Sequence, residues 1–286
     1  MFAGASELLP VASANLQLRL FTRIQFKTLQ CPGNWSSSVC AMCAVSDDVV
    51  LLSFNKKGLL AFSLQSGQLL PRTPCKLKRV SRMALDVGTD TLLLVLKTPT
   101  LNGHCWGLAS MRRVADVHEW KEVDRLTTEF ELSLQTQVIA VCESRVLFVA
   151  GSCKYLRAFD VSREHKLLPV GNVDVKSKFK YFTSTRIGTD NLVAFSHQNS
   201  VSLHRLVGLQ LEPFATIAST QLLWFLFRGP LLIGTRMNKD RKSSIISFLV
   251  TDNGLTLQPM VLLDFDSGVN VSHWCIVGDR LILRDG

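Results

Sequence analysis

The chain has 286 residues, a formal net charge of +9 at pH 7 and a mean hydropathy of +0.21. Hydrophobic residues make up 47% of it, and Gly and Pro are too few for a collagen-like or disordered chain. No run of about 18 uncharged apolar residues is present, so the composition predicts a globular protein without a membrane span.

The N-terminal segment lacks the basic start and the apolar run of a secretory signal peptide. We therefore expect an intracellular protein of the cytoplasm, the nucleus or both. Most of the eight cysteines lie within apolar runs, which is typical of free buried thiols in a reducing compartment. They are Cys31, Cys40, Cys43, Cys75, Cys105, Cys142, Cys153 and Cys275.

The segment from Val39 to Leu70 contains three short apolar runs that are rich in β-branched residues. They read VCAMCAV, VVLLSF and LLAFSL, and turn residues separate them. Each run has the length of a β-strand and each gap has the length of a hairpin loop. The pattern predicts an antiparallel sheet of consecutive strands.

This pattern recurs along the chain. The third strands of successive units are predicted to begin near Leu59, His104, Tyr155, Ser200 and Ser243, at spacings of 45, 51, 45 and 43 residues. A period of about 40 to 50 residues made of four antiparallel strands indicates a β-propeller blade, whereas a sandwich would not repeat at a fixed period. The ambiguous stretch 117–132 has residues that could share a helix face, but we interpret its first half as the outer strand of the second blade.

The sequence thus predicts an all-β protein, a single β-propeller domain over residues 1–286. Six blades are expected, or seven if two degenerate blades have been merged. Residues 15–30 are expected to complete the last blade with residues 270–286, and residues 1–14 to be flexible. Such a shared blade would remove the exposed sheet edges of an open array.

The strand pattern resembles the WD-repeat-like propellers over nearly the whole chain. Phe159-Asp160 stands where the Trp-Asp dipeptide of that family is expected, while Phe62-Ser63 and His204-Arg205 occupy the corresponding place in two other blades. The Gly-His dipeptide of the family does not recur; Gly103-His104 is single. The resemblance implies the propeller fold and carries no family function with it.

Motifs for catalysis are missing from the sequence, which has no Gly-x-Ser-x-Gly elbow, Walker loop or dinucleotide fingerprint. Cys40 and Cys43 form a Cys-x-x-Cys, but residues three apart on a strand point to opposite faces and no second pair follows at zinc-ribbon spacing. The histidines do not recur at equivalent blade positions; they are His104, His118, His165, His197, His204 and His273. We expect no catalytic residue, metal or cofactor.

Basic residues gather in two links between blades and in one hairpin turn, which should lie on the rims of a propeller. The clusters are Arg72, Lys76, Lys78, Arg79 and Arg82; Lys176, Lys178 and Lys180; and Arg236, Lys239, Arg241 and Lys242. Such rims attract phosphate backbones or acidic proteins, although a solvated face that keeps an apolar-rich protein soluble has the same composition.

Three functions are compatible with these features. The first is a non-catalytic scaffold or adaptor that binds one or more protein subunits of an intracellular multi-subunit complex, because a propeller always offers that surface. The second is an accessory subunit that contacts nucleic acid through its basic rim, in an RNA-modification or DNA-repair assembly. The least favoured is a propeller hydrolase with a metal on its axis.

Overall fold

The computed structural model of the protein describes residues 39–54, 58–71, 75, 77–100, 103–114, 119–128, 137–142, 145–150, 155–218, 222–237, 243–250, 260–264, 274–277 and 280–283. Every regular element in these residues is a β-strand. Within the same residues, no helix has the length and apolar character needed to cross a membrane.

Most of the strands form sheets of three or four neighbours. The first sheet contains β1 (Val39–Ala44), β2 (Val49–Phe54) and β3 (Gly58–Ser63); the second contains β4 (Val80–Asp86), β5 (Thr91–Thr100), β6 (Gly103–Val114) and β7 (Glu119–Thr128). The third contains β8 (Gln137–Cys142), β9 (Arg145–Ala150), β10 (Tyr155–Val161) and β11 (Leu167–Asp174). The fourth contains β12 (Tyr181–Ile187), β13 (Asp190–Ser196), β14 (Ser200–Val207) and β15 (Gln210–Ala218). The fifth contains β16 (Leu222–Arg228), β17 (Leu231–Met237), β18 (Ser243–Leu249) and β19 (Met260–Asp264), and β20 (Trp274–Val277) pairs with β21 (Arg280–Leu283).

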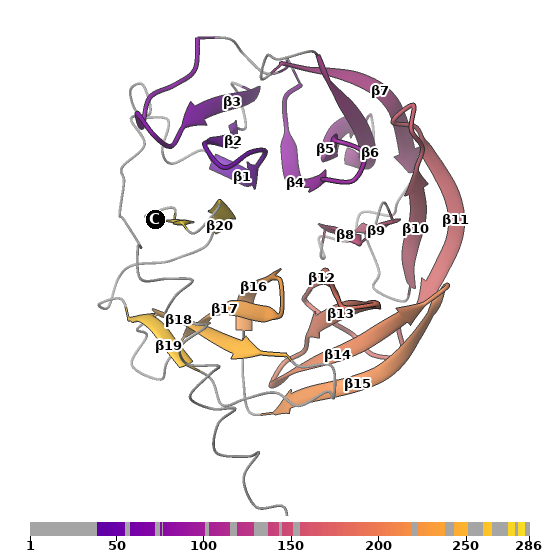
Figure 1. The fold of residues 1–286 in the computed structure, drawn as a ribbon. Coiled ribbons are helices and arrows are strands. Elements are labelled where there is room, and N and C mark those ends of the chain that lie inside the picture. The colour runs from indigo at the N-terminus through magenta and orange to yellow at the C-terminus, as the bar shows by residue number, and fades with distance from the viewer. Residues whose placement is uncertain are drawn as a thin grey trace, which may run out of the picture.

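These sheets stand around a common axis as the blades of a propeller (Figure 1). Within each blade the strands follow one another in chain order and pair antiparallel, and the first strand lies nearest the axis. The innermost strands of consecutive blades are neighbours, from β1 to β4, β8, β12 and β16. The all-β propeller predicted from the strand period is therefore confirmed.

The number of blades differs from the expected six or seven. Five blades of three or four strands are described, while β20 and β21 form a sheet of two strands beside β1, in the opening between the first and fifth blades (Figure 1). Two strands are half of an ordinary four-stranded blade. Residues 15–30, which were expected to supply the other half, lie outside the described residues, as do residues 1–14.

The repeat positions agree closely with the prediction. The third strands begin at Gly58, Gly103, Tyr155, Ser200 and Ser243, each within one residue of its expected start. Residues 119–128 of the ambiguous stretch form the strand β7, which is longer than expected because it pairs with the long strand β6 from Val114 to Trp106.

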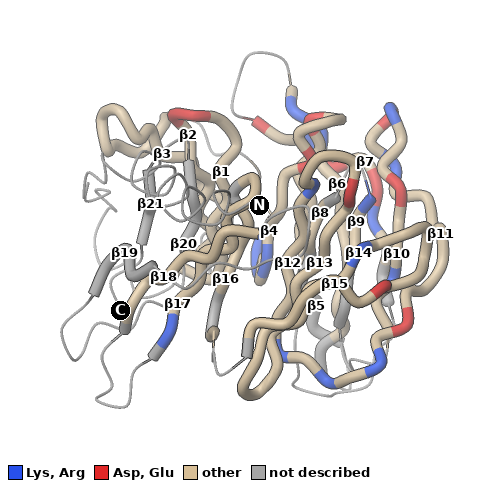
Figure 2. Tube along the Cα trace, turned by 60° about the horizontal axis from the view of Figure 1, so that its bottom comes forward, with Lys and Arg blue, Asp and Glu red and all other residues tan. Residues whose placement is uncertain are grey.

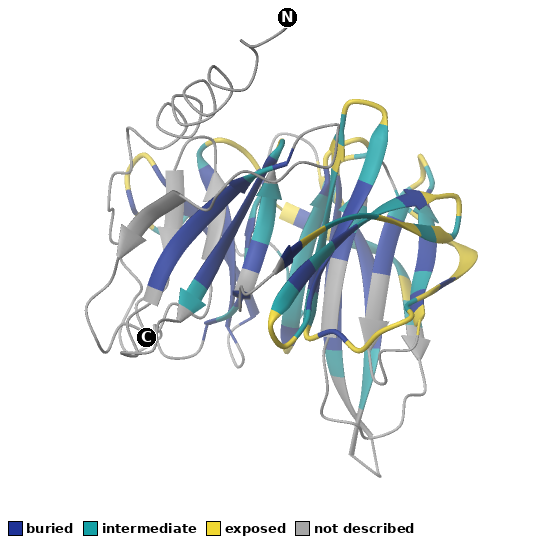
Figure 3. Cartoon of the chain, turned by 90° about the horizontal axis from the view of Figure 1, so that it is seen from below, coloured by how far each residue is buried: buried dark blue, intermediate teal, exposed yellow. Residues whose placement is uncertain are grey.

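The core consists of apolar layers between neighbouring blades, and exposed residues gather at the turns and links (Figure 3). Strand β5 shows how the layers form. Leu92 and Leu94 pack in the layer shared with the first blade, whereas Leu93 and Val95 pack in the layer shared with the third. Successive side chains of a strand point to opposite faces, so a middle strand covered on both faces reads as a continuous apolar run.

Two buried serines tie neighbouring blades together. The Ser53 hydroxyl, near the end of β2, donates a hydrogen bond to the Val80 carbonyl oxygen at the start of β4, over 2.8 Å. The Ser196 hydroxyl, at the end of β13, donates in the same way to the Leu222 carbonyl oxygen at the start of β16, over 2.9 Å. These bonds satisfy polar groups inside otherwise apolar layers, which a buried hydroxyl requires.

Two cysteines of these layers are predicted to be unreactive. Burial raises the pKa of Cys43 to about 12 and, as the main cause, that of Cys75 to about 11. Because the thiolate is the nucleophile, both should resist a maleimide at pH 7 until urea unfolds the chain. Peptide mapping by mass spectrometry measures the labelling, and rapid modification of Cys43 in the native protein would contradict this expectation. Cys40, Cys43, Cys75 and Cys105 are free cysteines.

Candidate interaction face

The propeller has two faces that differ in their connections. At one, which we call the link face, the innermost strands begin; there the chain passes between blades, as Ser53–Val80 and Ser196–Leu222 illustrate. At the other, the opposite face, the innermost strands end and turn into the second strands. The described parts of both predicted basic links lie at the link face, and β17 ends and β18 begins there.

The link between β11 and β12 presents three exposed lysines around one buried phenylalanine. Lys176, Lys178 and Lys180 are exposed, whereas Phe179 is only 5% exposed. The Phe179 ring packs edge-on against Phe182, with ring centroids 5.8 Å apart, in the layer between the third and fourth blades. Because the phenylalanine points inward, the neighbouring lysines project into solvent.

Hydrogen bonds hold the backbone of the same link. The Lys180 N–H donates to the Ser196 carbonyl oxygen over 2.8 Å, and His197 Nδ1 lies 2.9 Å from the Lys178 carbonyl oxygen. A carbonyl oxygen only accepts, so Nδ1 of His197 carries the hydrogen. In the neutral ring, Nε2 therefore accepts from the Ser202 hydroxyl, 2.7 Å away. The lysines thus stand on a backbone that is fixed at two points.

A second histidine, His204, extends this chain of hydrogen bonds toward the interior of the protein. His204 Nε2 lies 3.1 Å from the Ser202 oxygen, and the His204 ring packs edge-on against Phe195 at a centroid distance of 5.5 Å. Burial, with a smaller contribution from His197, lowers the pKa of His204, so this imidazole is neutral at pH 7. Its role here is in packing and in supporting Ser202.

The predicted basic cluster of the link between the first and second blades also contributes exposed positive charge. Lys78 and Arg79 are exposed in the segment before β4. The Arg79 carbonyl oxygen accepts a hydrogen bond from the Lys97 N–H over 3.1 Å, and the Lys97 ammonium lies 5.6 Å from the centre of the Trp106 ring. Sequence reasoning missed Lys97, because a single lysine at the end of an apolar strand gives no cluster signal.

Other members of the predicted clusters have different positions. Arg82 lies within β4 and not in the link; it is half-buried, its Nη1 donates to the Ser81 carbonyl oxygen over 2.7 Å, and burial lowers its pKa. It is therefore not part of an exposed rim. Arg236, near the end of β17 at the link face, is also only partly exposed. Outside the described residues are Arg72, Lys76, Lys239, Arg241 and Lys242.

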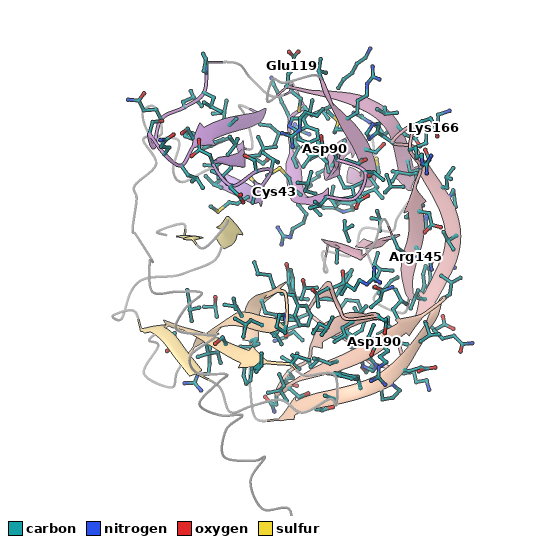
Figure 4. All side chains as sticks on the ribbon, viewed as in Figure 1. Cys43, Asp90, Glu119, Arg145, Lys166 and Asp190 are labelled. Atoms are coloured by element: carbon teal, nitrogen blue, oxygen red, sulfur yellow. The ribbon has the colours of Figure 1, made fainter. Side chains whose placement is uncertain are left out.

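Acidic side chains lie mainly at the opposite face, where arginines pair with them. Arg113 contacts Asp90 at 2.9 Å, Arg145 contacts Asp160 at 2.9 Å and Arg205 contacts Asp190 at 2.7 Å, in three successive blades (Figure 4). The fourth ion pair among the described residues joins Arg125 to Glu122 on the outer strand β7. None of the four involves the exposed lysines of the link face.

The two faces consequently differ in charge. Among the acidic side chains that the structure describes, only Asp174, at the end of β11, lies at a strand end on the link face. Figure 2 shows that both signs of charge occur along both edges, with red segments more frequent toward the upper edge. An uncancelled set of like charges raises the local concentration of oppositely charged partners.

Polar pairs occupy the positions that resembled the Trp-Asp dipeptide. The side chain of the second residue of each dipeptide contacts a polar side chain that lies at the start of the second strand of the same blade or just before it. Ser63 donates to Asp48 at 3.0 Å, Asp160 pairs with Arg145, and Arg205 pairs with Asp190. The chemistry of the pair varies from blade to blade, which explains why no constant dipeptide is visible in the sequence.

The alternative of an axial metal finds no ligand set in the described part of the chain. No group of three His, Cys, Asp or Glu side chains there is positioned to hold a metal ion. His165, for example, lies in a turn of the third blade, and its Nδ1 is 2.8 Å from the Thr91 hydroxyl of the second. That contact joins two blades.

The sequence matches no protein-family model and no curated protein. Solved structures with a similar fold include the WD40 repeats of RRP9, with a TM-score of 0.57, 10% identity, and coverage of 91% of this chain and 90% of that one. A candidate 6-phosphogluconolactonase from Bacteroides fragilis aligns with a TM-score of 0.52 and 10% identity over 88% of this chain and 89% of its own. A protein from Lactobacillus plantarum aligns with a TM-score of 0.54 and 9% identity over 79% and 70%.

These likenesses define the class of the protein at the level of its fold. It is a single β-propeller with WD-repeat-like architecture. At identities near 10%, the neighbours share the fold alone, and they range from WD40 repeats to a candidate lactonase.

Proposed function

We propose that this protein is a non-catalytic propeller that binds partner proteins in an intracellular multi-subunit complex of the cytoplasm or nucleus. The observation that supports this role is the uneven distribution of acidic side chains: exposed lysines and Arg79 stand at the link face with few acids near them, while most of the described carboxylates lie at the opposite face, three of them paired with arginines. A predominantly basic surface on a ring of blades steers and orients acidic partners.

Partner capture tests the proposal. The tagged full-length chain should retain a reproducible set of proteins, and Lys78→Glu with Arg79→Glu should reduce their recovery severalfold, because the change replaces attraction by repulsion at an exposed rim. The control carries Arg112→Glu and Arg163→Glu, which are exposed at the opposite face and absent from the four ion pairs. Quantitative mass spectrometry compares the three samples, and equal recovery with the link-face variant would contradict the role proposed for that face.

An accessory subunit that contacts nucleic acid is the second candidate, favoured by the same exposed basic residues in two links. In that case, retention on immobilised RNA or DNA should fall steeply with salt, since each neutralised phosphate releases counterions. The Lys78→Glu, Arg79→Glu variant should then show a flatter salt dependence. Retention that disappears well below physiological salt would exclude this function.

A further inference from the structure

The link between β11 and β12 carries a more specific inference, which rests on the proposed function. We propose that Lys176, Lys178 and Lys180, here called the lysine link, bind an acidic, extended segment of a partner protein. Successive Asp or Glu carboxylates of that segment would face the three ammonium groups. The link face would thus recognise a partner by a run of acidic residues.

The first argument is that the lysine link is already ordered. Phe179 is buried between its lysines, the Lys180 N–H bonds to Ser196, and the His197 ring bonds to the Lys178 carbonyl oxygen. Binding therefore does not have to order this stretch of backbone. On this side of the interface, the entropic cost of ordering falls on the lysine side chains alone. A fixed array of charges gives both affinity and register to an extended ligand.

The second argument concerns charge. The three lysines are exposed and take part in none of the four ion pairs of the described residues. Arginines use the carboxylates of the opposite face, so those acids do not cancel the potential of the lysine link. An incoming carboxylate meets hydrated ammonium groups with rotatable donors, which tolerate the variable geometry of a flexible acidic segment.

The third argument favours a polypeptide over a nucleic acid. Surfaces that hold single-stranded nucleic acid combine a basic groove with aromatic side chains on which bases stack. Among the described residues, Tyr155 is the exposed aromatic side chain, at 36%, and it pairs across the sheet with Asp174. The Trp106 ring is partly buried and lies beneath the Lys97 ammonium. The lysine link also has no arginine, the residue suited to bidentate phosphate contacts.

Fluorescence anisotropy with two labelled probes tests the inference. One probe is an oligoglutamate peptide and the other is an oligothymidine strand of the same length. The full-length protein should bind the peptide more tightly than the strand, with an affinity that falls as salt is added. Tighter binding of the strand, equal binding of both or no binding of the peptide would overturn the proposal.

Matched variants locate the site. Lys176→Glu, Lys178→Glu and Lys180→Glu together should weaken peptide binding roughly tenfold or more, given what exposed ion pairs contribute. The control Arg112→Glu, Arg163→Glu, Lys166→Glu makes the same change in net charge at exposed residues of the opposite face and should leave binding unchanged. An equal loss in both variants would mean general electrostatic attraction and would overturn the assignment to the link.

Folding and function are separated by two further measurements. Both triple variants should melt like the wild type, because exposed substitutions change stability by less than about 0.5 kcal/mol each. Lys→Gln at the three positions of the lysine link should weaken peptide binding by an intermediate factor. If the peptide fails to bind while capture of partners still depends on Lys78 and Arg79, the inference fails and the proposed function stands. If capture is also insensitive to those residues, both fail.

Discussion

Deleting residues 1–30 is expected to abolish the cooperative unfolding transition of the domain. The sequence predicts two strands in 15–30 that complete the ring. In the structure, the first and fifth blades each have buried residues on the sheet face directed away from the neighbouring second and fourth blades. Val50 and Phe62 of the first blade, and Leu231 and Ile233 of the fifth, are all 0% exposed. Loss of a covering layer would expose such faces to water, at about 25 cal/mol for each Å² of apolar surface.

Thermal unfolding followed by circular dichroism, with binding of a hydrophobic dye, measures this effect. The control is deletion of residues 1–14, which the sequence predicts to be flexible and which should leave the melting curve unchanged. A chain without residues 1–30 that melts like the full-length protein would show that the N-terminal strands are not part of the ring.

Replacing Phe195 by Ala is expected to destabilise the fold by about 3–5 kcal/mol. Phe195 lies in β13, is 1% exposed, and its ring centroid is 5.1 Å from that of Phe179 and 5.9 Å from that of Phe182. Truncation would leave a cavity in the layer between the third and fourth blades and remove three aromatic contacts, including the one with His204.

Chemical denaturation gives the free energy of unfolding for this variant. Phe195→Leu should lose less stability than Phe195→Ala, because leucine retains part of the side-chain volume. Leu168→Ala is the control: this side chain on β11 is 49% exposed, and its loss should change stability by less than about 0.5 kcal/mol. Because Phe179 carries the lysine link, Phe195→Ala should also weaken peptide binding there. A Phe195→Ala protein as stable as the wild type would contradict the packing described for this layer.

The propeller itself could be predicted because its cause is local. A strand such as β5, covered on both faces, requires a continuous apolar run, and each turn requires polar residues and glycine. Repetition of that pattern at a nearly constant spacing predicted the third strands, from Gly58 to Ser243, within one residue. The described residues form five blades and not the expected six or seven, since the pattern counts potential strands and does not show which of them pair.

The candidate site was only partly predictable. The three lysines and Phe179 are adjacent in the sequence, so their cluster was visible, but the inward direction of the phenylalanine depends on Phe182 and Phe195, which belong to the next blade. Arg82 was assigned to the same rim as Lys78, although β4 begins between them. Sequence proximity does not reveal the boundary at which a link becomes a half-buried strand.

Composition and strand spacing by themselves therefore determined that this chain is a basic, all-β protein with a repeated blade, because hydrophobic periodicity within a strand is a local property. Only the tertiary structure decided the distribution of charge. Whether Asp90, Asp160 and Asp190 neutralise arginines or face the lysine link depends on the face at which each blade turns, and antiparallel pairing sets that face. The separation of the paired acids from the lysine link is a consequence of the ring, because it brings the same end of every blade to the same side.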